Sequence, residues 1–276
     1  MCAHNAFDGI AQIKSIIGVE IMQSVQRMLG YMRKAIQEFD MIQDGDHIAV
    51  GVSGGKDSMV LLMGLTELRR FIGIDYKLTA ITIDPLFDGE RTDYSPIAEL
   101  CSKGGVDFKL IETDIARIVF DIKKDPNPCS LCAKLRRGAL HTATKELGCN
   151  KLALGHNYDD AVETFMMNLF NEGRIGCFAP VSYMSKRDLT VIRPMVLAPE
   201  RDVLRCAEGA ELTIVKSKCP EAGHTYRQVT KEMLKELEKT NRGVTARIFG
   251  AMRRAKVDGW AGKEFENYVC KTSVRS

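Results

Sequence analysis

The sequence of 276 residues predicts an α/β fold, a doubly wound parallel sheet with an N-terminal helix and a C-terminal helical extension. Short apolar runs alternate with stretches of helical periodicity, as in strands joined by helical crossovers. Hydrophobic residues make up 45% of the chain, enough for a sizeable core. We expect a lead-in and helix at 1–45, an α/β domain at 46–215 and a basic helical extension at 216–276.

The first expected elements follow from apolar spacing and from turn residues. Helical spacing predicts a helix at 19–39, and an Asp-Gly-Asp turn separates it from a β-branched run at 48–52. A glycine loop and a helix at 57–70 follow directly. The next apolar run, at 76–83, reads as a second strand because it ends at an Asp-Pro pair.

The middle of the chain continues the alternation. A helix at 94–103 leads to a strand at 106–112, and a helix at 114–122 ends before a break with two prolines. A long helix at 130–147 precedes a short buried strand at 152–154. This pitch of strands and helices is typical of a parallel sheet.

The last expected elements are less regular. A helix at 158–171 is followed by a glycine-rich connection and a strand at 190–193. Residues 223–256 have helical periodicity that is broken at 241–243, whereas 1–18 show no clear pattern. No internal repeat or low-complexity segment interrupts the chain.

Cysteine usage and the start of the chain predict a compartment. Nine cysteines, an odd number in a large chain, disfavour a disulfide framework and point to metal ligation or catalysis. No run approaches the length of a membrane span, and the first residues lack the features of a signal peptide. We therefore expect a soluble cytoplasmic protein without a membrane partner.

Charge is distributed unevenly. The net charge is +3, but residues 216–276 contain fourteen Lys and Arg against seven Asp and Glu, which gives +7 and leaves −4 for the rest. A basic end on a near-neutral body suggests a polyanionic partner. A solvated helix surface with surplus lysines explains the charge equally well.

The most informative segment directly follows the first strand. Two glycines, a lysine and two serines between a strand and a helix direct backbone N–H groups and a helix N-terminus at one point, which is how proteins hold phosphate. The spacing is neither that of a P-loop nor that of a dinucleotide fold. We expect phosphate binding by Ser53, Gly54, Gly55, Lys56, Asp57 and Ser58.

Two other strand ends carry candidate ligands, because ligands of open α/β sheets bind beyond the carboxyl ends of strands. Asp84 ends the strand at 76–83 and is a candidate for adenosine or metal, or a plain turn residue. Gly155, His156 and Asp159 follow the strand at 152–154 and are nucleotide-binding candidates. Asp160 is a candidate for assisting Mg²⁺ or a proton transfer, with Asp57 as a second carboxylate.

Cys129 and Cys132 form a C-x-x-C at the start of a helix, where the helix dipole lowers thiol pKa values. Such a pair suits a redox couple, half a zinc site or part of an iron–sulfur site. The chain has no second C-x-x-C, so a third ligand must come from a distance, and Cys219 is the candidate. Cys149 and Cys177 are poorer candidates. Apolar helical spacing predicts two core cysteines, Cys101 and Cys206.

These motifs together resemble a known family. S-G-G-K-D-S and G-H-N-x-D-D-x-x-E-T resemble the PP-loop ATP pyrophosphatase superfamily. C-S-L-C-x-K-L-R-R-G, the distal cysteine and Tyr226-Arg227-Gln228 resemble its tRNA 2-thiocytidine synthetase family (TtcA type). The sequence departs from that family at Lys216, which stands where a further cysteine is common. It lacks the zinc-ribbon cysteines of the related two-thiouridine enzymes.

The resemblance implies an activity and its cofactors. ATP would adenylate a cytidine 2-oxo group in the anticodon loop of tRNA, with Lys56, Asp57 and Asp160 catalytic and Mg²⁺ assisting, and sulfur would replace the activated oxygen. The positions that match the family's [4Fe–4S] ligands are Cys129, Cys132 and Cys219. The implied partners are tRNA and a sulfur donor such as a cysteine desulfurase or free sulfide. The sequence leaves the oligomeric state open, a homodimer included.

Two other functions remain open at this stage. A lysidine synthetase would attach an amine to an anticodon cytidine without a cluster, and the three cysteines would then be incidental. A catalytically silent nucleotide- or tRNA-binding regulator is a different class, which the intact S-G-G-K-D-S disfavours. The basic residues expected to contact tRNA phosphates are Lys134, Arg136, Arg137, Arg227, Arg247, Arg253 and Arg254.

Overall fold

A six-stranded sheet of order β3-β2-β1-β4-β6-β5 forms the centre of the computed structural model, which describes residues 22–124, 128–216, 218–219 and 226–262. The strands are β1 (Asp46–Gly51), β2 (Tyr76–Asp84), β3 (Asp107–Glu112), β4 (Lys151–Ala153), β5 (Val181–Met184) and β6 (Leu189–Ile192). The pairs β1–β2, β2–β3, β1–β4 and β4–β6 are parallel, and the edge strand β5 is antiparallel to β6. The predicted α/β class is confirmed, but the sheet is not parallel throughout.

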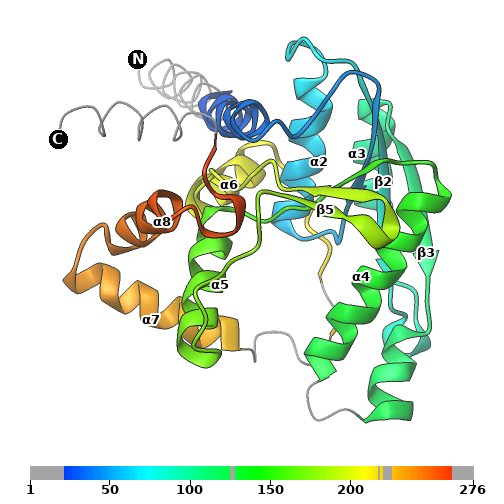
Figure 1. Ribbon diagram of the computed structural model, residues 1–276. Coiled ribbons are helices and arrows are strands. Elements are labelled where there is room, and N and C mark those ends of the chain that lie inside the picture. Colours follow the sequence, from blue (N-terminus) through cyan, green and yellow to red (C-terminus); the bar gives the residue numbers. More distant parts are fainter. Residues whose placement is uncertain (1–21, 125–127, 217, 220–225, 263–276) are drawn as a thin grey trace, which may run out of the picture.

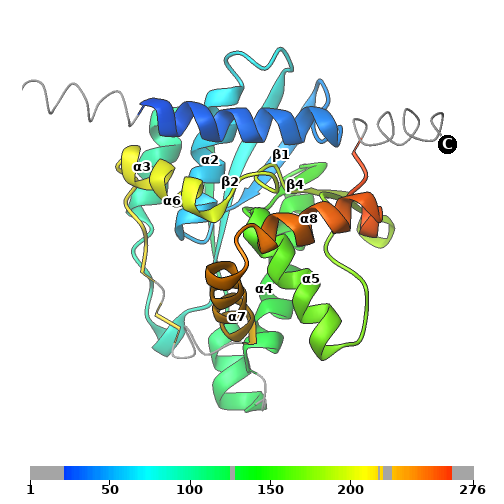
Figure 2. The same ribbon diagram turned by 90° about the vertical axis from the view of Figure 1, so that its left-hand side faces the viewer.

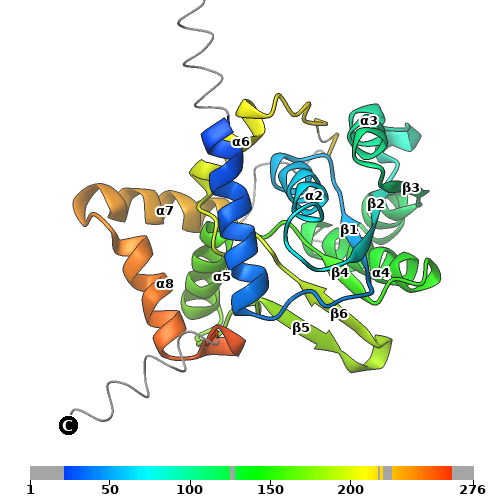
Figure 3. The same cartoon turned by 90° about the horizontal axis from the view of Figure 1, so that it is seen from above.

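Helices cover both faces of this sheet (Figure 3). The described α-helices are residues 22–38, α2 (Lys56–Leu68), α3 (Ser95–Gly104), α4 (Pro128–Glu146), α5 (Tyr158–Asn171), α6 (Glu200–Gly209), α7 (Tyr226–Thr240) and α8 (Val244–Arg254). A π-helical segment spans Arg117–Lys123, and 3₁₀ turns span Phe87–Gly89, Ser185–Arg187 and Val257–Gly259. Figure 3 shows α2 and α4 on opposite sides of the sheet.

Alternation along the strands produces two cores. Ile48 and Val50 of β1 are fully buried in the core that also contains α2 and helix 22–38. Ala49 points the other way, into the core beneath α4. The sheet therefore lies between two apolar layers, as a doubly wound fold requires.

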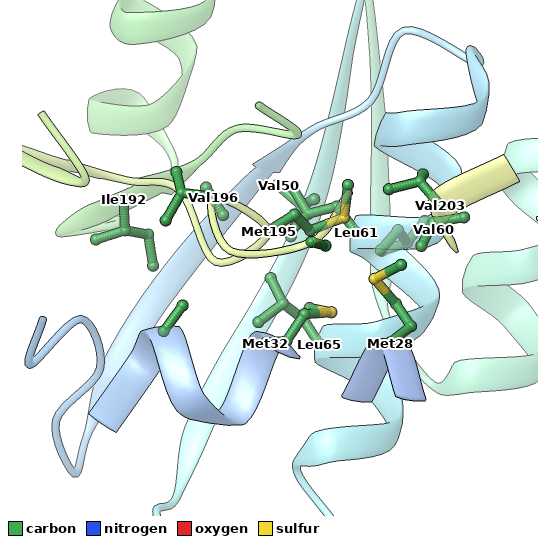
Figure 4. Packing of buried hydrophobic residues seen from close by; sticks show 14 of the residues in the cluster. Met28, Met32, Val50, Val60, Leu61, Leu65, Ile192, Met195, Val196 and Val203 are labelled. Atoms are coloured by element: carbon green, nitrogen blue, oxygen red, sulfur yellow. The ribbon is translucent and has the colours of Figure 1, made fainter. Parts of the chain in front are cut away.

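Helix 22–38 packs directly on α2 (Figure 4). Met28 and Met32 are fully buried against Leu61 and Leu65 of α2 and against the segment after β6. A Cβ at Gly64 would lie 2.4 Å from the Met32 sulfur, so a larger residue there would displace the Met32 side chain from its place on α2. The packing fixes α2, and with it the loop that precedes α2.

The C-terminal helices pack against α5 rather than standing apart (Figure 1, Figure 2). The fully buried Trp260 packs edge-on against Phe39 and Phe249, and its indole N–H donates to the Phe178 carbonyl oxygen at 2.8 Å. The predicted break at 241–243 is confirmed, because it separates α7 from α8.

The order of the strands in the sheet determines where a ligand can bind. The chain runs outward from β1 through β2 to β3 and then returns to place β4 on the other side of β1. The strand order therefore reverses between β1 and β4, and the crevice beyond their carboxyl ends is where doubly wound folds bind ligands. The predicted strands and helices are present, with ends shifted by a few residues. Sequence reasoning missed β5 and α6, and the helix expected at 114–122 is π-helical at Arg117–Lys123.

Candidate active site

Residues 53–58, here called the phosphate loop, connect β1 to α2 at that crevice. The Ser53 N–H donates to Ser58 Oγ at 3.2 Å, and Ser58 Oγ donates to the Gly55 carbonyl at 2.9 Å. Gly54 has φ +84°, a left-handed conformation that glycine adopts without strain. Gly55 is the N-cap of α2 and has no side chain to cap it, so the first N–H groups of α2 remain available to an anion.

Gly155, after β4, packs on the phosphate loop. A Cβ at Gly155 would lie 3.1 Å from the carbonyl carbon and oxygen of Asp57 and 3.2 Å from the Ser58 nitrogen. These neighbours are backbone atoms, which cannot move aside as a flexible side chain can. Glycine here keeps the start of α2 against the end of β4.

Helix α5 begins with a reciprocal cap next to this contact. The Asn157 side chain accepts from the Asp160 N–H at 3.1 Å, and Asp160 accepts from the Asn157 N–H at 2.9 Å. The Asn157 amide also donates to Asp57 at 3.0 Å. Asn157 therefore ties the candidate catalytic carboxylates Asp57 and Asp160 to each other through one side chain.

Asp160 is also paired with α7. Its other oxygen accepts from Arg227 at 2.8 Å, and Arg227 also reaches Glu163 at 3.4 Å and Thr164 at 3.2 Å. Burial and the neighbouring Asp160 carboxylate raise the pKa of Glu163 to about 7, although Arg227 opposes the shift. Arg227 thus meets a carboxyl group that exchanges its proton near neutral pH.

Lys56 lies between two carboxylates. Its Nζ is 2.9 Å from Asp57 Oδ2 and 3.1 Å from Glu200 Oε1. Burial lowers the pKa of Lys56, but the hydrogen bonds and charges of these two carboxylates outweigh it and hold the pKa above its ordinary value. Glu200 is shared with Lys231 of α7, whose Nζ is 2.7 and 2.6 Å from its two oxygens.

Two cavities meet at Asp57. The first, here called the strand-end cavity, has a volume of about 360 Å³. Its lining includes the phosphate loop, His156, apolar side chains of β2 and β4, and Arg136 and Arg137 of α4. The second, here called the charged cavity, has a volume of about 270 Å³ and lies between Lys56, Asp160, Glu200 and Lys231.

His156 contributes an unpartnered nitrogen to the strand-end cavity. Its Nδ1 is buried without a hydrogen-bond partner among the described residues, and its ring packs on Phe178 with centroids 4.8 Å apart. Burial, together with Arg193, Arg227 and Arg137, lowers its pKa to about 3. His156 is therefore neutral at physiological pH.

Asp84 has a different environment from the other candidates. Its carboxylate is fully buried, and it accepts from the Leu86 N–H at 3.0 Å and from the Thr92 N–H at 3.1 Å. Both oxygens thus hold the loop after β2, as in a turn aspartate. A contact with nucleotide or metal stays a prediction for this residue.

Cysteines 129, 132 and 219 approach one another although 219 is distant in sequence. Cys129 and Cys132 lie in the first turns of α4. Burial raises the pKa of Cys132, Arg136 opposes this, and the neighbouring thiols of Cys219 and Cys129 raise the pKa further. Cys132 therefore lies within electrostatic range of both other thiols. One helical turn after it, Arg136 lines the strand-end cavity.

Residues 212–216, here called the strap, bring the chain past the phosphate loop toward Cys219. The Val215 N–H donates to the Gly54 carbonyl at 3.0 Å, and a Cβ at Gly54 would lie 2.5 Å from the Val215 Cβ. Lys218 then pairs with Glu90 at 2.8 Å. The cysteine expected to be the third ligand is thus tethered beside the candidate nucleotide site.

The other described cysteines lie apart from Cys129, Cys132 and Cys219 and are buried or hydrogen-bonded within the fold. Cys101 and Cys206 are buried, and burial raises both pKa values to about 11, which confirms them as core residues. Cys177 donates to the Ala161 carbonyl at 3.3 Å, and burial raises its pKa to about 12. Among the described residues, no three His, Cys, Asp or Glu side chains are placed to hold a single metal ion. Cys2 and Cys270 lie outside the described residues.

Some expected tRNA contacts are already paired within the protein. Arg253 forms an ion pair with the almost fully buried Glu38, and Arg227 is committed to Asp160. Arg253 is largely buried, with 14% of its side chain exposed, whereas Arg227 keeps 39% exposed, and contact of either residue with tRNA stays a prediction. They anchor the C-terminal helices to the rest of the fold. Arg247 and Arg254 are exposed and remain candidates.

Residues that sequence reasoning missed share one property: their partners are distant in sequence. Glu200 contacts Lys56, and Lys231 contacts Glu200. Val215 contacts Gly54. His141 is buried and lines the strand-end cavity. No local motif marks any of them.

Within the described part of the chain, no helix has the length and apolar character needed to cross a bilayer.

Comparisons with known proteins agree with this geometry. A family model described as the PP-loop domain matches residues 24–234. A tRNA-cytidine(32) 2-sulfurtransferase of Geobacter sulfurreducens is 40% identical over 222 residues, covering 79% of this chain and 86% of that protein. One of Syntrophotalea carbinolica is 39% identical over 240 residues, covering 86% and 91%.

A solved structure extends the likeness. The U34-tRNA thiolase NcsA from Methanococcus maripaludis, determined with its [4Fe–4S] cluster, has 29% sequence identity and a TM-score of 0.68. The match covers 82% of this chain and 77% of that one. The shared fold thus includes a thiolase that holds an iron–sulfur cluster.

Proposed function

The chain belongs to the PP-loop family and, within it, to the tRNA-cytidine(32) 2-sulfurtransferases, and on that premise we propose how its residues carry out the reaction. It is a tRNA sulfurtransferase that uses ATP to replace the 2-oxo group of a tRNA cytidine with sulfur. We place the target at position 32, as the names of the relatives state.

One observation carries the assignment of the site. The phosphate loop, His156 and the α4 residues Arg136 and Arg137 line the same cavity, and α4 begins with Cys129 and Cys132. A nucleotide held by the loop would therefore lie beside the helix that bears two of the thiols. The cytidine that ATP activates must also be reached by the incoming sulfur. A cavity that borders both the phosphate loop and the helix with Cys129 and Cys132 supports this.

Activation of the base is assigned to the phosphate loop and the charged cavity. A cytosine 2-oxo group is a poor leaving group, and adenylation makes it a good one while pyrophosphate departs. The free N–H groups at the start of α2 and the Lys56 ammonium would stabilise charge on the phosphates. Asp57 and Asp160 face Lys56 and Arg227, and they are the candidates for orienting Lys56 or a Mg²⁺ ion.

Cysteines 129, 132 and 219 are assigned as ligands of a [4Fe–4S] cluster. The donor set fits, because thiolates are the usual ligands of such clusters and Cys132 lies within electrostatic range of both other thiols. When bound with three protein ligands, the cluster would supply one iron at which sulfide is held. Free sulfide would provide it directly, and a cysteine desulfurase would provide it after a thiol reductant has reduced the persulfide to sulfide.

The test is a reconstituted reaction. Protein purified without oxygen is incubated with ATP, sulfide, lysine and tRNA from a strain that lacks this activity, and the nucleosides are analysed by mass spectrometry. We expect 2-thiocytidine in proportion to pyrophosphate released. Formation of lysidine, or pyrophosphate release without thiolation by iron-loaded protein, would contradict the assignment. Absence of iron from anaerobically purified protein would contradict the cluster.

A further inference from the structure

A chain of alternating charges connects α7 to the phosphate loop. Lys231 of α7 contacts both oxygens of Glu200, and Glu200 contacts Lys56 at 3.1 Å. All three side chains are about one-quarter exposed and line the charged cavity. A single carboxylate thus bridges two ammonium groups that belong to segments far apart in sequence.

Glu200 is itself held rigidly. It is the first residue of α6, where a carboxylate is favoured by the helix dipole, and its N–H donates to Asp159 at 2.6 Å. Helix α6 packs on α2, which begins with Lys56. Burial raises the pKa of Glu200, but the hydrogen bonds from Lys231 and Lys56 outweigh it and hold the pKa below its ordinary value. Glu200 is therefore anionic at physiological pH.

Lys56 needs such a partner. A lysine side chain has four rotatable bonds and loses rotamer entropy when it is fixed. Asp57, its sequence neighbour, provides one contact, and Glu200 provides a second from a different element. Two carboxylates in different directions define the position of the ammonium, whereas one leaves it free to swing.

We propose that Glu200 is a positioning residue that holds the Lys56 ammonium at the phosphate loop and, through Lys231, makes that position depend on α7. The proposal rests on the proposed function, in which Lys56 acts on ATP, and on the expectation from the charge pattern that the C-terminal helices contact tRNA. A displacement of α7 would change how Lys231 shares Glu200 and would thereby displace Lys56. The rate of pyrophosphate release would then respond to a contact between α7 and tRNA, beyond the need for tRNA as the molecule that is adenylated.

Charge removal at Glu200 is the direct test. In Glu200→Gln, the two ammonium groups lose the carboxylate between them, so we expect kcat for tRNA-dependent pyrophosphate release to fall about 10- to 100-fold. The KM for ATP should change little, because the backbone N–H groups of the phosphate loop remain. Glu208→Gln, on the exposed side of the same helix, is the matched control and should behave as wild type.

The double variant separates positioning from simple structural damage. Lys231→Gln alone should reduce the stimulation of pyrophosphate release by tRNA. Combined with Glu200→Gln, it removes one of the two repelling ammonium groups, so the double variant should be faster than Glu200→Gln alone. Additive losses, or wild-type kcat in Glu200→Gln, would overturn the proposal. If Glu200→Gln lowers Tm, its kcat no longer tests positioning, and the Lys231→Gln variant is used instead. Stimulation of pyrophosphate release by tRNA that is as large in Lys231→Gln as in wild type would then overturn the proposal.

Wild-type protein keeps this test separate from the proposed function. If wild type forms 2-thiocytidine while Glu200→Gln retains full kcat, only the role of Glu200 fails. If wild type neither thiolates tRNA nor releases pyrophosphate, the proposed function fails, and the role of Glu200 fails with it.

Discussion

The strand-end cavity and the charged cavity share Asp57 but offer a ligand opposite environments. Beyond the phosphate loop and two arginines of α4, the strand-end cavity is lined by aliphatic side chains, and His156 leaves a nitrogen there without a partner among the described residues. In the charged cavity, ammonium and guanidinium groups are matched to carboxylates at 2.6 to 3.4 Å. One cavity is ready to receive a flat, uncharged ring, while the other must rearrange its ion pairs before it accepts a phosphate.

This difference separates binding from catalysis. Apolar walls exclude water and fit a base by shape, which contributes equally before and during the reaction. Ion pairs that are already satisfied add little to binding, but they hold charges in place for the moment when new charge develops. Variants of the charged cavity should therefore change kcat, and variants of the strand-end cavity should change KM.

The largest effect is expected at Lys56. Lys56→Ala removes the charge that faces the phosphates, so pyrophosphate release should fall by about 10²- to 10³-fold, measured by a coupled phosphate assay. The Tm should be unchanged, because the side chain is at the surface of a cavity rather than in a core. Lys103→Ala, on the exposed side of α3, is the control. Near-normal turnover of Lys56→Ala would contradict the assignment of catalysis to the charged cavity.

Cys219→Ala tests the assignment of the third cluster ligand, next to the division between the two cavities. It should abolish the visible absorbance of the iron–sulfur cluster and the formation of 2-thiocytidine, while ATP-dependent pyrophosphate exchange persists. Cys206→Ala, which changes a core thiol, should keep the absorbance. Full cluster absorbance in Cys219→Ala would require another third ligand, with Cys177 next.

Gly155→Ala should have an intermediate effect. The added Cβ meets the backbone of Asp57 and Ser58 at 3.1 to 3.2 Å and pushes the phosphate loop away from β4. We expect KM for ATP to rise about tenfold with a smaller loss of kcat. Gly30→Ala, where a Cβ meets no atom within 4 Å, should leave both constants unchanged. A loss confined to kcat would show that the glycine serves the charged cavity.

The smallest effect is expected from Glu163. Its pKa rises from 4.5 to about 7, so the folded chain binds this proton more tightly than the unfolded chain does. The resulting stability is fully present below pH 4.5 and is lost as the pH rises to about 7. Glu163→Gln should remove that decline and raise Tm at pH 8 by a few degrees, with little change at pH 4.5. Exposed Glu146→Gln should keep the wild-type profile, and an unchanged slope in Glu163→Gln would contradict the shift.

Sequence reasoning succeeded where the information is local. The phosphate loop is six consecutive residues between a strand and a helix, and the rule for strand ends brings Gly155 to its side. Strand β5 escaped notice because it has four residues at the sheet edge, without alternating burial. Helix α6 escaped because its ten residues carry only a short apolar pattern between charged side chains.

The ion pairs of the site could not be read from the sequence. Glu200 is one of 36 acidic residues, and nothing near it distinguishes it from a solvated one. Its role depends on how α6 packs on α2 and on where α7 begins. The same holds for Arg253, which the charge pattern suggests for tRNA and which is instead paired with Glu38.

The hydrogen bond from the Val215 N–H to the Gly54 carbonyl bears on when a cluster could be assembled relative to synthesis and folding of the chain. A ribosome delivers the phosphate loop and both cysteines of α4 long before Cys219, and the strap needs a folded loop to bind. The two thiols of α4 would therefore be made before Cys219, their assigned third partner. Insertion of iron and sulfide would then have to wait until the strap has closed, which places it after synthesis and makes it dependent on a folded nucleotide site.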